Sequence, residues 1–284
     1  MARLPLGTVR RVGAVLGRLN WLASSRMATT TRININNCLP EIDANNRKLL
    51  AKSSISHTFQ AMAEGAPAWL WPPEKVLDHI LEVDGLEHLE AAKAQGKGVV
   101  VMAPHLGNWE VFGLYLNNCG FGRSSQLYQA PKDPRLDKFI YQARSRSGAN
   151  MVPTNAKGVG LLLKALKRGE IVGILPDQVP NEQGGEFAPL FGRQAFTMTL
   201  VARLLEKTGA KAVLGYARRV RVGNRAGWKI VFMQPGNDIY ARHIPNSLLA
   251  MNRCIELAVH ESPEQYQWEY KRFRRVPEGE TRPY

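Results

Sequence analysis

Short apolar runs alternate with amphipathic segments along most of the chain after residue 80. Apolar runs bounded by glycine or charged residues are typical of buried parallel strands, and apolar positions recurring every three to four residues predict helices. The pattern predicts strands over 98–103, 125–129, 171–175, 211–218 and 228–233, and helices over 86–94, 108–118, 134–147, 158–167, 196–207 and 245–260. This alternation predicts an α/β fold with a mostly parallel central sheet flanked by helices.

The first 80 residues show no such alternation and are predominantly helical in pattern. A polar helical stretch covers 29–66, with a helix start indicated at Pro40, and an aromatic, proline-stiffened break follows at 69–73. In segment 4–22, five apolar side chains share one arc of a helical wheel and three arginines fall on the other side. These residues are Val9, Val12, Val15, Leu16 and Leu19, and Arg10, Arg11 and Arg18.

Such an amphipathic helix can lie in the plane of an anionic membrane surface, and it can equally pack on the protein's own core. We expect residues 1–28 to form a membrane-associating helix and residues 29–284 to form a single α/β domain. No apolar run reaches the roughly 20 residues that a spanning helix needs, and the interrupted pattern does not fit a cleaved signal peptide.

The composition adds positive charge to this picture without choosing a partner. The 284 residues include 38 Lys and Arg against 24 Asp and Glu, a formal net charge of +14. Such an excess favours nucleic acid, an anionic membrane face or an acidic protein as partner. Three scattered cysteines and histidines without metal-ligand spacing predict neither a disulfide framework nor a metal site.

The strongest chemical signal lies where the strand predicted at 98–103 gives way to a helix. His105 follows the strand, Gly107 allows a sharp turn, and Glu110 falls in the first helical turn. At the carboxyl end of a strand, a carboxylate that orients an imidazole creates a general base for acyl transfer to a hydroxyl. The plainer interpretation is a capping carboxylate beside a hydrogen-bonded structural histidine.

Further positions could complete such a site. Arg144 and Arg146 share a predicted helix and could hold substrate phosphates or an oxyanion, or they could form a solvated basic face. Asp177 follows a buried strand at the same sheet edge and could support the site or cap the next loop. Gly192 and Arg193 could shape an acyl or phosphate pocket, or form a turn beside a surface arginine.

Three blocks of sequence resemble the lipid A biosynthesis branch of the lysophospholipid acyltransferase-like superfamily. They are APHLGNWE at 103–110, which contains an HxxxxE motif, ILPDQ at 174–178 with FAPLFGR at 187–193 and AFT at 195–197, and PEQYQWEYKRF at 263–273. Their order and spacing fit the family over nearly the whole chain. The glutamate at 110 favours this branch over glycerophosphate acyltransferases, which usually have aspartate at that position.

The resemblance implies a glycerophosphate-acyltransferase-like fold and an O-acyltransferase without a metal or cofactor. The implied reaction moves a fatty acyl chain from acyl-carrier-protein thioester to a hydroxyl of a lipid A precursor, as a secondary acylation. His105 would be the general base, Glu110 would support it, and Arg144 fits the family's arginine after the second strand better than Arg146. The acidic carrier, the lipid phosphates and the anionic inner membrane would all match the positive charge.

We therefore expect a protein at the cytoplasmic face of the bacterial inner membrane, held peripherally or by a shallow anchor. Family members often begin with a spanning segment, which Arg10, Arg11 and Arg18 interrupt here. Nucleic acid is not an expected partner, because the basic residues are spread out and no recognition motif occurs. Two alternatives stay open. The acceptor could be another glycolipid, a lysophospholipid or an ornithine-type lipid, or the protein could be a non-enzymatic basic membrane- or nucleic-acid-binding protein.

Overall fold

A seven-stranded sheet forms the centre of the molecule in the computed structural model, which describes residues 1–131 and 133–284. The strand order is β1-β9-β8-β2-β5-β3-β4, and every pair is parallel except β8 with β9. The strands are β1 (Ile80–Asp84), β2 (Val99–Met102), β3 (Ser124–Tyr128), β4 (Asn150–Pro153), β5 (Ile171–Ile174), β8 (Lys211–Val222) and β9 (Arg225–Met233). The predicted α/β class and mostly parallel sheet are confirmed.

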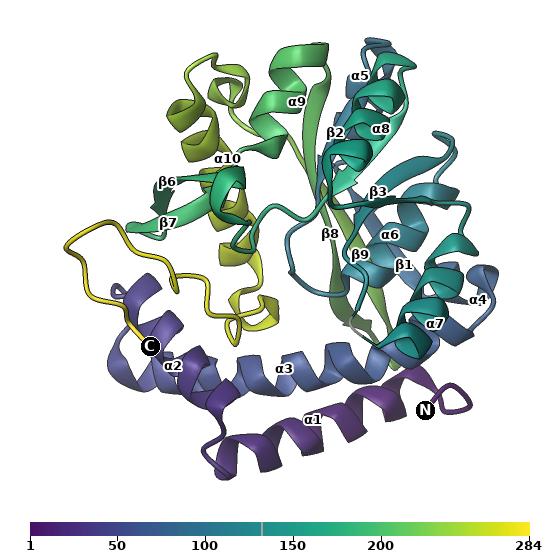
Figure 1. Ribbon diagram of the computed structural model, residues 1–284. Helices are drawn as coiled ribbons and strands as arrows, with labels where there is room; N and C mark the ends of the chain where they lie inside the picture. Colours follow the sequence, from purple (N-terminus) through teal and green to yellow (C-terminus); the bar gives the residue numbers. More distant parts are fainter. Residues whose placement is uncertain (132) are drawn as a thin grey trace.

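Helices cover both faces of this sheet (Figure 1). They are α1 (Leu6–Leu22), α2 (Arg26–Cys38), α3 (Ala44–Leu70), α4 (Pro73–Leu77), α5 (Leu86–Ala94), α6 (Trp109–Asn118), α7 (Pro134–Ser145), α8 (Ala156–Lys167), α9 (Leu200–Thr208) and α10 (Ile244–Glu261), with 3-10 turns η1 (Glu182–Gly184), η2 (Asn237–Tyr240) and η3 (Pro263–Gln265). In β2, Val99 and Val101 pack into one apolar cluster, whereas Val100 and Met102 pack into the other. The central strands are therefore buried on both sides, as their continuous apolar sequence predicts.

A separate antiparallel hairpin, β6 (Gly185–Leu190) with β7 (Arg193–Met198), replaces the start of a predicted helix. The helix expected over 196–207 begins only at Leu200, because Phe196 belongs to β7, where it pairs with Phe187 of β6. The helix start expected at Pro40 is also displaced. Asp43 is the N-cap of α3, and its carboxylate accepts hydrogen bonds from the N–H groups of Asn45 and Asn46.

Helix α1 packs lengthwise on α3, and both run below the sheet in Figure 1. Gly13 and Gly17 permit this close approach, because a Cβ on either glycine would lie 2.6–2.7 Å from backbone Cα atoms of α3. The predicted division of segment 4–22 into an apolar face and an arginine face is partly wrong. Val9 is buried, and Arg10 points inward instead of lying among solvent-facing arginines, because it finds a buried carboxylate on α3.

The outward surface of α1 is nevertheless apolar. Val15, Leu16, Leu19 and Leu22 are exposed, the last by 76%. Arg11 and Arg18 are exposed on the same helix. Among the described residues, no helix combines the length and apolar character needed to cross a bilayer.

Candidate active site

His105 lies in the loop between β2 and α6, and neighbouring segments hold this loop on two sides. The N–H of Asn108 donates to the carbonyl of Ala217 on β8 (2.8 Å), and the N–H of Gln267 donates to the carbonyl of His105 (3.1 Å). Gly107 has φ of 68°, and a Cβ there would lie 2.0 Å from the Ala217 oxygen, so the loop requires glycine. The third sequence block thus shapes the loop that carries the histidine.

Asp177 holds the imidazole ring of His105. Its Oδ1 lies 2.8 Å from His105 Nδ1, and its Oδ2 accepts the His105 backbone N–H at 2.8 Å. The two side chains come together because β2 and β5 are adjacent parallel strands, and both residues follow the carboxyl ends of these strands. With Nδ1 donating to the carboxylate, Nε2 is the ring nitrogen left to accept a proton.

Asp177 is almost completely buried, yet it remains a carboxylate. Burial opposes its charge, but the neighbouring His105 ring and its two hydrogen bonds hold the pKa of Asp177 below its ordinary value. An ionised Asp177 favours the ring tautomer with the proton on Nδ1 and would stabilise an imidazolium at this position.

Glu110 is paired with Arg144 instead of with His105. The Arg144 Nε and Nη2 groups donate to the two Glu110 carboxylate oxygens at 2.9 and 2.5 Å. This fork-shaped pair raises the pKa of Arg144 even though burial acts in the opposite direction. The structure therefore corrects the expected pairing, since Asp177 and not Glu110 orients the His105 ring. Glu110 lies in the first turn of α6, and its cationic partner Arg144 lies on α7.

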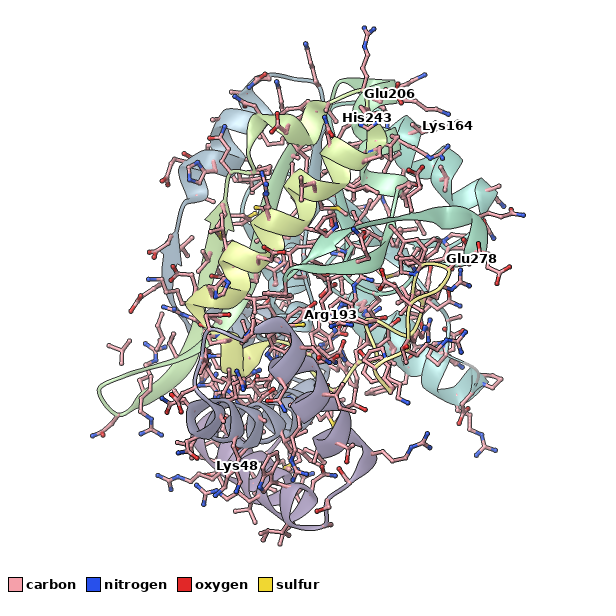
Figure 2. All side chains as sticks on the ribbon, turned by 90° about the vertical axis from the view of Figure 1, so that its left-hand side faces the viewer. Lys48, Lys164, Arg193, Glu206, His243 and Glu278 are labelled. Atoms are coloured by element: carbon pink, nitrogen blue, oxygen red, sulfur yellow. The ribbon has the colours of Figure 1, made fainter. Side chains whose placement is uncertain are left out.

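The other predicted site residues lie elsewhere. Arg146 is exposed at the end of α7, and its Nε contacts the Ala143 carbonyl at 3.5 Å. Gly192 and Arg193 are at the turn of the β6–β7 hairpin, and Arg193 lies over the Phe273 ring. Figure 2 shows Arg193 near the C-terminal segment. The described residues that line the two cavities at His105 include none of these three.

A buried ionic network beneath the His105 loop is not evident from the sequence. Glu64 of α3 is fully buried and accepts hydrogen bonds from Arg10 Nε (2.5 Å), Asn108 Nδ2 (2.9 Å), Trp228 Nε1 (3.3 Å) and Arg219 Nη1 (3.4 Å). Burial disfavours the Glu64 charge, but the two arginines keep the pKa of Glu64 below its ordinary value. The network links helices α1 and α3 to the active-site loop.

Without the Glu64 carboxylate, the protein should be less stable and should unfold more easily. Glu64→Ala leaves Arg219 buried without its carboxylate partner, and we expect the free energy of unfolding to fall by about 3–5 kcal/mol in a urea titration. Glu90→Ala removes an exposed carboxylate on α5 and should change the free energy of unfolding by less than about 0.5 kcal/mol. Equal stability of the two variants would contradict a structural role for this network.

A cavity of about 1060 Å³ opens beside His105. Its inner lining is mainly apolar and includes Val101, Phe112 and Leu116. Exposed arginines, Arg203 and Arg274, lie on its solvent side. The cavity thus offers room for an extended apolar group beside the His105 ring, with cations on its solvent side.

Neither a metal centre nor a cysteine nucleophile fits this site. The described residues contain no group of three or more His, Cys, Asp or Glu side chains that could hold a metal ion. Burial raises the pKa of Cys38 and of Cys254 to about 12, which makes both poor nucleophiles.

Comparisons with known proteins agree with the sequence blocks. The family model of bacterial lipid A biosynthesis acyltransferases matches residues 1–275. The lipid A biosynthesis lauroyltransferase of Escherichia coli K12 is 28% identical over an alignment of 284 positions. This alignment covers 98% of this chain and 89% of the relative. The palmitoleoyltransferase of the same organism is 27% identical over 98% of this chain and 89% of its own length, and the myristoyltransferase is 25% identical over 96% and 82%.

Proposed function

Because this chain belongs to the bacterial lipid A biosynthesis acyltransferase family and is an acyltransferase, we propose that it acylates a hydroxyl of a lipid A precursor. The proposed donor is an acyl-carrier-protein thioester, and the product is a secondary acyl ester. The observation that supports this most directly is the His105–Asp177 pair at the edge of the 1060 Å³ cavity. Another glycolipid or lysophospholipid acceptor remains the alternative.

In the proposed reaction, the acyl group passes from the donor thioester to the acceptor hydroxyl in one transfer, without an acyl-enzyme intermediate. His105 Nε2 takes the proton of the acceptor hydroxyl as its oxygen attacks the thioester carbonyl, and Asp177 stabilises the imidazolium. The C–O ester bond forms, the C–S bond breaks, and the proton passes from His105 to the departing thiolate. The N-terminus of α6 offers backbone N–H groups and a positive dipole to the developing oxyanion. In this scheme Glu110 contributes by fixing the Arg144 guanidinium at the cavity wall.

Purified protein, labelled acyl donors and a panel of lipid acceptors test this function. We expect transfer to a lipid A precursor, with acyl-carrier-protein thioester used better than the coenzyme A thioester. Mass spectrometry of lipid A from cells that lack the protein should show the loss of one acyl group. Unchanged lipid A, together with transfer to another lipid in the panel, would favour the alternative acceptor.

The apolar part of the large cavity suits the fatty chain, and we expect Gln126 in its wall to limit the length of chain that it admits. This side chain of β3 lies between Gly113 of α6 and Gly173 of β5, since a Cβ added to either glycine would lie 3.4 Å from Gln126 atoms. All three residues line the cavity. The two glycines leave the space that Gln126 occupies, so its length limits the depth available to a chain.

Substitutions of Gln126 and of Gly173 should shift the preferred acyl-chain length in opposite directions. Gln126→Ala should move the preferred donor to a chain about two carbons longer, and Gly173→Ala should move it to a shorter one, because each added or removed methylene is worth about 1 kcal/mol. Competition assays with donors of different length measure the shift. Gly160→Ala on α8, where an added Cβ meets no atom within 4 Å, should leave the preference unchanged. The same preference in all three variants would place the chain elsewhere.

The exposed face of α1 supports peripheral binding at the cytoplasmic face of the inner membrane. Its leucines offer apolar surface to the lipid boundary, and Arg11 and Arg18 can contact anionic headgroups. The wider positive charge is spread over the molecule, with Lys48 and Lys164 at opposite ends (Figure 2). The concentration of exposed apolar side chains therefore favours α1 as the contact.

The double variant Leu19→Glu and Leu22→Glu should weaken binding to anionic phosphatidylglycerol vesicles at least about tenfold, since both leucines would lose apolar burial and gain charge. Co-sedimentation measures the bound fraction. Leu257→Glu replaces an equally exposed leucine on α10 and should leave binding unchanged. If both proteins bind the vesicles as well as the unaltered chain, α1 is not the contact.

A further inference from the structure

A second, smaller cavity borders the same histidine. Its volume is about 210 Å³, and it lies between α3 and the segment 265–269. Four residues line both cavities: Trp69, His105, Trp109 and Glu110. Direct transfer requires the donor and the acceptor to reach one imidazole together, and two adjoining cavities at His105 meet that requirement.

The polar groups of the small cavity differ from those of the large one. Its cation, Arg219, is already engaged by Glu64 and by the Gly107 carbonyl at 3.0 Å. The large cavity instead has the exposed arginines Arg203 and Arg274. A phosphate would therefore be bound in the large cavity, and the small cavity is suited to a neutral group.

Hydrogen-bonding side chains of α3 and of the segment 265–269 line the small cavity. His57 Nδ1 accepts a hydrogen bond from Arg219 Nε at 3.3 Å, and burial together with Arg219 lowers the pKa of His57 to about 3. The ring is therefore neutral, with a proton on Nε2 that has no partner among the described residues. Thr58 Oγ1 donates to Glu269 Oε2 at 3.0 Å, and burial raises the pKa of Glu269 above its ordinary value.

Two indole rings complete the lining. The ring centroids of Trp109 and His105 are 5.1 Å apart, and both Trp69 and Trp109 line the two cavities. Flat aromatic surfaces next to neutral hydrogen-bonding groups match a sugar ring, which has apolar C–H faces and a rim of hydroxyls.

We propose that the small cavity binds a sugar ring of the acceptor glycolipid, with the acyl chain of the donor in the large cavity. This inference rests on the proposed function and adds the position of the acceptor. His57, Thr58 and Glu269 would bind the ring hydroxyls, the two indole rings would pack against the sugar, and the acceptor hydroxyl would lie next to His105 Nε2.

Binding of octyl N-acetyl-β-D-glucosaminide, measured by isothermal titration calorimetry, tests the proposal without turnover. Ala61→Leu fills the small cavity from α3 and should weaken binding at least tenfold, and Thr58→Val removes one hydroxyl and should weaken it roughly fivefold. Ala44→Leu makes the same change at an exposed position at the start of α3 and serves as the control. Thermal melts establish that each variant is folded.

In bisubstrate kinetics, Ala61→Leu and Thr58→Val should raise the KM of the acceptor and leave the KM of the donor unchanged. The control Ala44→Leu should change neither KM. Glycoside binding that Ala61→Leu does not weaken, or no binding to the unaltered protein, would overturn the proposal even if acyl transfer to lipid A precursor is intact. Failure of that transfer with normal glycoside binding would instead reject the proposed function and keep the sugar site.

Discussion

His105→Ala should lower the rate of acyl transfer by about 10²- to 10⁴-fold, because the acceptor hydroxyl loses its general base. The fold should persist, since the ring of His105 is held by Asp177 and contributes little else to the core. Transfer of labelled acyl chains under single-turnover conditions measures the chemical step, and circular dichroism measures the fold.

The control for this variant is His88→Gln, which changes a histidine on α5 and should keep full activity. His105→Gln should be as inactive as the alanine variant, because an amide keeps a hydrogen-bonding group but cannot accept the proton. Undiminished transfer by either His105 variant would exclude the mechanism and leave the histidine a structural residue.

Asp177→Asn should cost about 10²- to 10⁴-fold in kcat with little change in KM. The amide preserves the shape of the aspartate but cannot stabilise the imidazolium and allows the wrong ring tautomer.

A purely structural Asp177 would give a different result. Its loss would lower the melting temperature and the fraction of active protein without lowering the single-turnover rate of the molecules that stay folded. Asp177→Glu, which restores the negative charge at a slightly different distance, should recover part of the rate. Full activity of Asp177→Asn would show that the buried hydrogen bond at 2.8 Å has no role in catalysis.

Local sequence predicts the elements that depend on local contacts. The buried strands β2 and β5 follow from their apolar runs, and Asn108 caps α6 as expected, its Oδ1 accepting the Val111 N–H. The position of His105 at the end of β2 is equally local. These features depend on hydrophobic periodicity and capping chemistry within a few residues.

The missing parts of the site depend on contacts between distant segments. Asp177 is 72 residues from His105 in sequence, and only the adjacency of β2 and β5 brings them together. Without that topology, the nearer Glu110 is the natural partner to predict. The position of Arg10 could not be predicted for a similar reason, because amphipathic periodicity does not show that Glu64 is buried beneath the helix.

The pairing of the His105 loop with residues 265–267 also has a consequence for synthesis. His105 and Asp177 leave the ribosome well before the segment that pairs with the His105 loop, and domains form progressively as the nascent chain emerges. A translation product that stops before residue 265 would contain both reactive side chains but no template for the loop. We therefore expect a chain truncated before residue 265 to hold the His105 loop less firmly than the full-length chain does.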